Sequence, residues 1–155
     1  MNYLQIGAIA ALVFIDQFTK YLIKTNLALY ESKDIFSFLS LTYIHNTGIA
    51  FGVFQNKDYS NLILIFVMIA IIGVFIYNQK SLTELGSKTT PAALVFIYGG
   101  AFGNLIDRIF VGKVVDFIDF HFFPVFNAAD SCITIGGILL FLSFILKRND
   151  KKLNA

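Results

Sequence analysis

The chain has 155 residues, enough for one domain, and 57% of them are hydrophobic whereas only 14% are charged. Soluble domains are on average about half apolar and about a quarter charged, so the excess apolar surface, with a mean hydropathy of +0.72, is expected to face lipid. The net charge of +2 and the lack of a basic stripe with interleaved aromatic residues argue against nucleic acid as a partner.

Four segments are apolar and long enough to cross a bilayer as helices, at residues 3–23, 61–78, 91–109 and 128–146. The first contains Asp16 and Lys20, but it has no basic n-region and no small-residue cleavage site. We therefore interpret it as a retained span and not as a signal peptide that is removed. The third begins at Pro91, which suits a first helical turn. The prediction is an all-α membrane protein, with residues 1–155 as a single integral membrane domain.

The segments 25–60 and 111–127 join these spans on one side of the membrane. Within the first, residues 35–44 (IFSFLSLTYI) are rich in aromatic and β-branched residues, which predicts one or two strands at the membrane surface. The second, which we expect to be a short loop, holds the densest polar cluster of the chain.

The positive-inside rule orients the spans. Basic residues occur in the loop between the second and third spans and in the tail, at Lys80, Lys88, Lys147, Arg148, Lys151 and Lys152. A smaller group on the other side opposes this orientation: Lys20, Lys24, Lys33 and Lys57. Because the tail cluster is dense, we expect both termini to be cytoplasmic and 25–60 and 111–127 to face outward.

Polar residues inside the spans need a reason, since a charge at the centre of a membrane helix costs at least about 2.5–3.5 kcal/mol. Asp16 and Lys20 are four residues apart and can pair on one helical face, which a purely structural role would also explain. Asn104, Asp107 and Arg108 share a face of the third span. The adjacent Asp107 and Arg108 diverge around the helix and should have separate partners. An alternative role for Arg108 is only to reach for the headgroups.

Small residues and caps add to this picture. Gly99 and Gly103 form a small-xxx-small pair, which favours close approach of another helix. Asn127 and Asp130 begin the last span, where Asn127 is also a candidate N-cap. Asp116 lies between the third and fourth spans, in the run VVDFID.

Other polar residues have simpler explanations. We interpret Asp119 as a solvated or interfacial carboxylate, and Cys132 as a packing residue without a base beside it. His45 and His121 are isolated and lack the spacing of metal ligands, so no metal site is expected.

The chemistry that remains rests on carboxylates, because no phosphate-binding loop, no HExxH motif and no nucleophile beside a base is evident. Two carboxylates held close share one proton, so one can activate water while the other protonates the scissile carbonyl. This pair hydrolyses amides without a metal or cofactor. One alternative is an assembly subunit without chemistry. The other is a small transporter or channel in which carboxylates relay protons or cations, namely Asp16, Asp107, Asp116 and Asp130.

Five motifs distinguish these alternatives, and together they resemble the lipoprotein signal peptidase (signal peptidase II) family. They are DQFTK (16–20), NTGIAFG (46–52), GGAFGNLIDR (99–108), VVDFID (114–119) and FNAAD (126–130). The resemblance implies an aspartic endopeptidase of the bacterial inner membrane that cleaves lipid-modified prolipoproteins just before the diacylglyceryl-cysteine. It also implies a small extracytoplasmic β-sheet near 35–44, an active site near the outer face, no cofactor, and inhibition by globomycin.

Carried over residue by residue, the resemblance makes Asp116 and Asp130 the catalytic pair. The residues that it assigns to substrate binding or to orienting the pair are Asn46, Asn104, Arg108 and Asn127. Those that it assigns to polar support are Asp16, Lys20 and Asp107. The partners implied are the prolipoprotein and membrane lipid, and we expect the protein to act as a monomer. Residues 117–129 are shorter than the covering loop of some family members, which leaves lid behaviour open.

Position also suggests a division of labour. Asp130 lies in the first turn of the last span, where the helix dipole favours the ionised carboxylate by about 0.3–1 kcal/mol when exposed. Asp116 lies in an apolar run, where desolvation raises the pKa. We therefore expect Asp116 to hold the shared proton more often.

Overall fold

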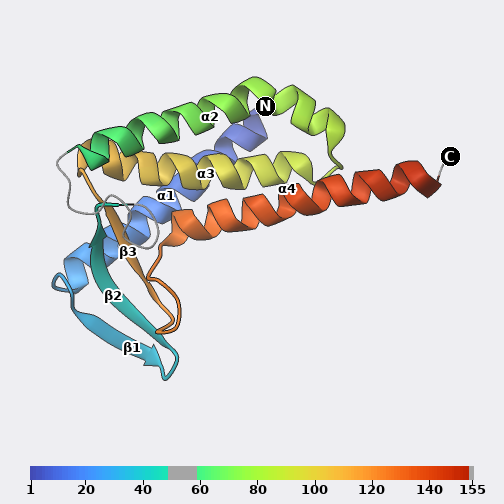
Figure 1. Ribbon diagram of the computed structural model, residues 1–155. Coiled ribbons are helices and arrows are strands. Elements are labelled where there is room, and N and C mark those ends of the chain that lie inside the picture. Colours follow the sequence, from blue (N-terminus) through green and yellow to red (C-terminus); the bar gives the residue numbers. More distant parts are fainter. Residues whose placement is uncertain (49–58, 154–155) are drawn as a thin grey trace.

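The computed structural model describes residues 1–48 and 59–153 (Figure 1). Its elements are α1 (Tyr3–Asn26), β1 (Ser32–Phe36), β2 (Leu39–Asn46), α2 (Ser60–Leu85), α3 (Thr90–Phe110), β3 (Val114–Asp119) and α4 (Ala128–Leu153). The four predicted spans are confirmed as helices that are long and apolar enough to cross a membrane. Residues 49–52 of the NTGIAFG motif, and Lys57, lie outside the described residues.

Local sequence explains where several helices begin and end. Asn2 caps α1, and its side chain and that of Gln5 form a reciprocal capping box. Pro91 lies in the first turn of α3, as predicted. However, α2 continues to Leu85 and not to residue 78, because the polar residues after its apolar run are good helix formers. At 26 residues, α2 rises about 39 Å, which exceeds the hydrocarbon thickness of about 30 Å.

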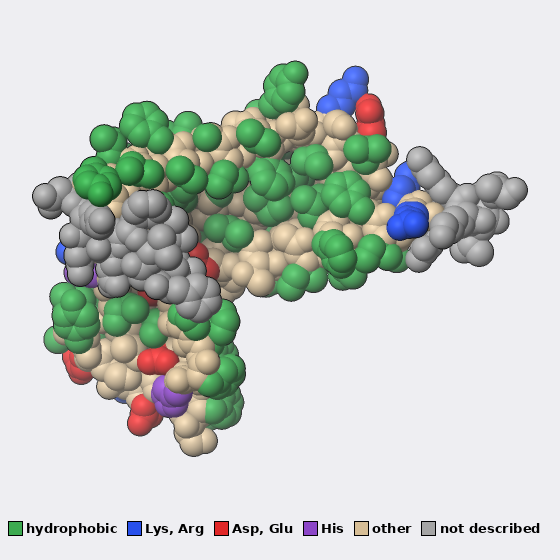
Figure 2. All heavy atoms as spheres, viewed as in Figure 1, with side chains coloured by type: hydrophobic (Ala, Val, Ile, Leu, Met, Phe, Trp, Pro, Cys, Tyr) green, Lys and Arg blue, Asp and Glu red, His purple; other side chains and the backbone are tan. Residues whose placement is uncertain are grey.

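Helix α3 is the centre of the bundle. In its most apolar stretch 61% of the residues are buried, against 17% in each of the other three helices. α3 packs against α1, α2 and α4, whose remaining faces carry exposed apolar side chains (Figure 2). This distribution is what a lipid-facing ring of helices around a buried one requires.

Glycines allow the helices to approach α3. A Cβ added to Gly99 would lie 2.8 Å from Leu12 Cβ, and one added to Gly103 would lie 2.6 Å from Asp16 Oδ2, so the predicted small-xxx-small pair does pack against α1. A third contact was not predicted. At Gly136 of α4, a Cβ would lie 2.7 Å from Ile97 Cγ1 and 2.8 Å from the carbonyl oxygen of Ala93 in α3.

The strands form one antiparallel sheet in the order β1-β2-β3, at the end of the bundle away from both termini (Figure 1). The hairpin β1–β2 contains the predicted strand. The prediction that residues 111–127 form only a loop is wrong, because Val114–Asp119 pairs with β2 and places Asp116 opposite Ile44. An apolar cluster of Ile23, Tyr43, Val115 and Phe117 attaches the sheet to α1.

The close contact at Gly136 gives a test with an internal control. Gly136→Ala should lower the thermal stability of the detergent-solubilised protein, since the added methyl group meets backbone atoms of α3, and overpacking costs about 1–3 kcal/mol. Gly137→Ala should leave stability unchanged or raise it, because no atom lies within 4 Å of its added Cβ and alanine favours the helix. Equal melting temperatures for the two variants would contradict the proposed packing.

Candidate active site

All nine residues assigned from the resemblance lie at the sheet end of the bundle, where five elements meet. They come from α1 (Asp16, Lys20), β2 (Asn46), α3 (Asn104, Asp107, Arg108), β3 (Asp116) and the start of α4 (Asn127, Asp130). Eight of them, all except Arg108, belong to one network of hydrogen bonds and ion pairs, described below.

Asp116 is almost fully buried, with 1% of its surface exposed. Asn46 Nδ2 donates to its Oδ2 at 2.9 Å, and Asn127 Nδ2 donates to its Oδ1 at 2.6 Å. Both amides favour the ionised carboxylate, but burial outweighs them, and the negative charge of Asp130 acts in the same direction as burial. The pKa of Asp116 is therefore raised to about 6.

Asp130 lies in the first turn of α4 and is partly exposed. Asn104 Nδ2 donates to its Oδ1 at 2.8 Å, and the backbone N–H of Asn127 donates to its Oδ2 at 3.3 Å. In return, the backbone N–H of Asp130 donates to Asn127 Oδ1 at 2.9 Å. These last two bonds form a capping box, so Asn127 is the N-cap of α4, as one hypothesis had it.

Asn127 does more than cap the helix. While its Oδ1 caps α4, its Nδ2 donates both to Asp116 and, at 3.2 Å, to Asn104 Oδ1. The side chain is completely buried. One amide therefore contacts one aspartate directly and fixes the helical turn that carries the other.

A second layer supports this pair from α1. Lys20 Nζ lies 2.8 Å from Asp16 Oδ2 and 2.9 Å from Asp107 Oδ2, and it donates to Asn104 Oδ1 at 3.0 Å. The bond to Oδ1 turns the Nδ2 of Asn104 toward Asp130. The predicted pair of Asp16 and Lys20 is thus present.

The two carboxylates of this layer also bind the backbone beside each member of the aspartate pair. Asp16 Oδ1 accepts the N–H of Ala129 at 2.9 Å, and Asp107 Oδ2 accepts the N–H of Val115 at 3.4 Å. The support layer therefore fixes the strand and the helix that carry the two aspartates.

Gln17 belongs to the same layer, and sequence reasoning missed it. Its Nε2 lies within hydrogen-bond distance of Asp16 Oδ2 (3.2 Å), Asp107 Oδ1 (3.0 Å) and the carbonyl oxygen of Gly103 (3.1 Å). Its sequence did offer a signal, because Gln17 is a polar amide inside the first predicted span and directly follows Asp16. The amide links α1 to α3 where the two carboxylates face each other.

Arg108 is buried, with 6% of its surface exposed, so the hypothesis that it only reaches for the headgroups is wrong. As expected, it does not share partners with Asp107. Its Nη2 donates to the carbonyl oxygen of Gly48 at 2.6 Å, whereas Nη1 has no hydrogen-bond partner among the described residues. The guanidinium lies close enough to Asp116 and Asp130 to interact with their charges. Among the described residues, Nη1 is thus a donor without a partner beside the aspartates.

Asp119 and the two histidines lie on the sheet or just after its last strand. Asp119 accepts hydrogen bonds from Thr42 and from the N–H of His121, and His45 bonds to Tyr43. Among the described side chains, which are those of residues 1–48 and 59–148, no three His, Cys, Asp or Glu residues are grouped as metal ligands would be.

Comparisons with known proteins identify the family of the chain. Residues 8–146 match the family described as signal peptidase (SPase) II. The chain is 46% identical to the lipoprotein signal peptidase of Caldanaerobacter subterraneus subsp. tengcongensis over 90% of this chain and 94% of that protein. It is 40% identical to that of Enterococcus faecalis, over 92% of this chain and 88% of that protein.

A solved bacterial membrane enzyme has the same fold, with a TM-score of 0.76 and 32% identity, covering 95% of this chain and 90% of its own. A second has a TM-score of 0.69 and 33% identity, over 89% of this chain and 90% of its own. The protein is thus a multi-pass membrane protein, and the resemblance seen in its motifs is confirmed. The chain belongs to the signal peptidase II family.

Proposed function

We propose that this protein is an aspartic endopeptidase that removes the signal peptide from lipid-modified prolipoproteins. Its relatives carry the name lipoprotein signal peptidase, and the chain matches nearly their full length. The observation that carries the mechanism is the pair Asp116 and Asp130, held through Asn127 at one end of a membrane-spanning bundle. The family membership favours a peptidase over a proton-relaying transporter or an assembly subunit.

The proposed reaction uses one proton shared by two carboxylates. Ionised Asp130, the more exposed partner, takes a proton from a water molecule, and the water oxygen attacks the carbonyl carbon that precedes the lipid-modified cysteine. Asp116 gives its proton to the carbonyl oxygen, and a tetrahedral diol forms. The proton taken by Asp130 then passes to the leaving amine, the C–N bond breaks, and Asp116 recovers its proton from the diol.

Neighbouring residues supply orientation. Asn104 and Asn46 each donate to one aspartate, so they fix the carboxylate planes. Nη1 of Arg108, which has no partner among the described residues, is suited to bind a carbonyl oxygen of the substrate peptide, because a buried donor without a partner costs about 1–3 kcal/mol until it finds one.

The orientation in the inner membrane is part of the proposal. Basic residues gather in the C-terminal tail, and Lys80 and Lys88 lie at or near the α2–α3 connection, so we place both termini in the cytoplasm and the sheet with its aspartates at the outer face. Exposed phenylalanines at the sheet end, linked by ring contacts through Phe120 and Phe126, support the position of the sheet at the membrane surface; they are Phe36, Phe38, Phe122 and Phe123. Figure 2 shows hydrophobic side chains exposed on this part of the protein. A lipid-anchored substrate reaches such a site by lateral diffusion in the membrane. Because one chain contains all of the site residues described, we propose that the protein acts as a monomer.

The activity is tested by cleavage of a diacylglyceryl-modified prolipoprotein with the purified protein. Asp116→Asn and Asp130→Asn should each lower the rate by about 10²–10⁴-fold, since each removes one acid–base partner. Asp119→Asn is the matched control, and it should cleave nearly as well as the wild type because, among the described residues, the Asp119 side chain bonds to Thr42 and His121 and to none of the site residues. Globomycin should block the wild type.

Two outcomes would count against this function. Absence of cleavage by the wild type, under conditions where another family member cleaves, would refute the peptidase. Substantial turnover by either aspartate variant would refute the two-carboxylate mechanism.

The pH profile tests the proton assignment. Because Asp116 works as the acid and has a pKa of about 6, kcat/KM should fall as the pH rises through about 6. Asn46 donates to the ionised carboxylate and so lowers this pKa. Asn46→Ala should therefore move the falling limb to higher pH, by up to about one unit. A limb that stays in place, or moves to lower pH, would contradict the assignment.

A further inference from the structure

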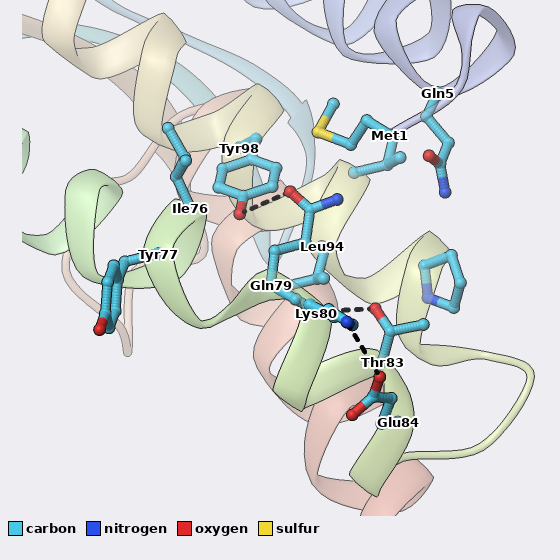
Figure 3. A pocket seen from close by; sticks show the side chains of 12 residues that line it. Met1, Gln5, Ile76, Tyr77, Gln79, Lys80, Thr83, Glu84, Leu94 and Tyr98 are labelled. Atoms are coloured by element: carbon cyan, nitrogen blue, oxygen red, sulfur yellow. Dashed lines mark hydrogen bonds and ion pairs between the residues drawn. The ribbon is translucent and has the colours of Figure 1, made fainter.

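A cavity of about 580 Å³ opens at the end of the bundle opposite the aspartates, between the start of α1, the second half of α2 and the start of α3 (Figure 3). The proposed peptidase does not use it. Its volume lies within the range of about 300–1,000 Å³ that is typical of small-molecule sites. Because it lies at the helix ends, it opens where a bilayer would change from acyl chains to headgroups.

One buried polar group points into the cavity without a good partner. Tyr98 is 1% exposed, and within the described residues its hydroxyl makes a single hydrogen bond, to Gln79 Oε1 at 3.5 Å. Hydrogen bonds between oxygens are normally about 2.5–3.0 Å long. Figure 3 shows the two side chains pointing toward each other across this gap. A buried tyrosine hydroxyl usually has a partner, so this one is ready to bind another acceptor.

The lining divides into an apolar wall and a charged rim. Ile76, Leu94 and Val95 form the wall, beside the Tyr98 ring. At the rim, Lys80 Nζ and Glu84 Oε1 are 4.0 Å apart, and their side chains are 90% and 66% exposed. A pair this long and this exposed contributes little by itself, so both charges remain available to a ligand.

We propose that the cavity binds a phospholipid with a zwitterionic, amine-bearing headgroup. The phosphate pairs with Lys80, the ammonium pairs with Glu84, and an ester carbonyl of the glycerol accepts the Tyr98 hydroxyl. The acyl chains then follow the apolar wall into the bilayer. This arrangement matches each part of an amphipathic ligand to a feature of the cavity, and the two opposite charges favour a zwitterionic headgroup over an anionic one.

The inference rests on the membrane-spanning helices and is independent of the peptidase mechanism. A lipid bound here would touch α1, α2 and α3 together and stabilise the bundle at the end opposite the sheet. Phosphatidylethanolamine is the probe for the proposed class, and phosphatidylglycerol is the anionic comparison.

The test is lipid titration of the purified protein in detergent, followed by native mass spectrometry. The wild type should bind phosphatidylethanolamine more tightly than phosphatidylglycerol. Tyr98→Phe, which keeps the ring, should weaken binding of both lipids by about 3–10-fold, as expected for one lost hydrogen bond. Glu84→Gln should weaken binding of phosphatidylethanolamine by a similar factor and remove the preference for it.

Lys88→Gln is the matched control, since Lys88 is an exposed residue of the same end and does not line the cavity. It should bind both lipids as the wild type does. Equal affinity of the wild type for the two lipids, a preference for phosphatidylglycerol, or unchanged binding by Tyr98→Phe and Glu84→Gln would each overturn the proposal.

Discussion

The buried amide of Asn127 is the interaction on which the arrangement of this site depends. Its oxygen caps α4 and so fixes the turn that carries Asp130, while its nitrogen donates to Asp116 on β3. One side chain therefore fixes strand β3 and helix α4 relative to each other. The same amide group caps α4 and contacts Asp116. The position of Asn127 therefore depends on both contacts.

Burial of the charged residues behind this site requires that their charges be balanced. Two carboxylates, Asp16 and Asp107, are buried around the single ammonium of Lys20, and the amide of Gln17 provides additional hydrogen bonds. Removing one partner of a buried ion pair destabilises a protein far more than the intact pair stabilises it, because the other charge is left buried and unpaired. This is why these residues form one connected layer. Gly103 leaves room for the carboxylate of Asp16, so close helix packing and buried charge depend on each other.

Much of this could be predicted from the sequence because it depends on local pattern. Long apolar runs gave the four spans, and i+3 and i+4 spacings placed Asn104, Asp107 and Arg108 on one helical face. Strand β3 was not predicted, because its partner β2 lies about 70 residues away in the sequence and the run VVDFID does not alternate apolar and polar residues. The hydrogen bonds of Gln17 and the close contact at Gly136 were not predicted either. Both depend on which helix lies opposite, and no local sequence pattern encodes the neighbouring helix.

The claim that Asp116 and Asp130 form one proton-sharing pair is tested most directly by following their carboxyl carbons through a pH titration by NMR. With ¹³C-labelled aspartate, Asp116 should titrate near pH 6 in the wild type. It should titrate at lower pH in Asp130→Asn, because the neighbouring negative charge that opposes its ionisation is gone. Titration of Asp116 near its ordinary value of 3.8 in the wild type, or at the same pH in both proteins, would contradict the pair.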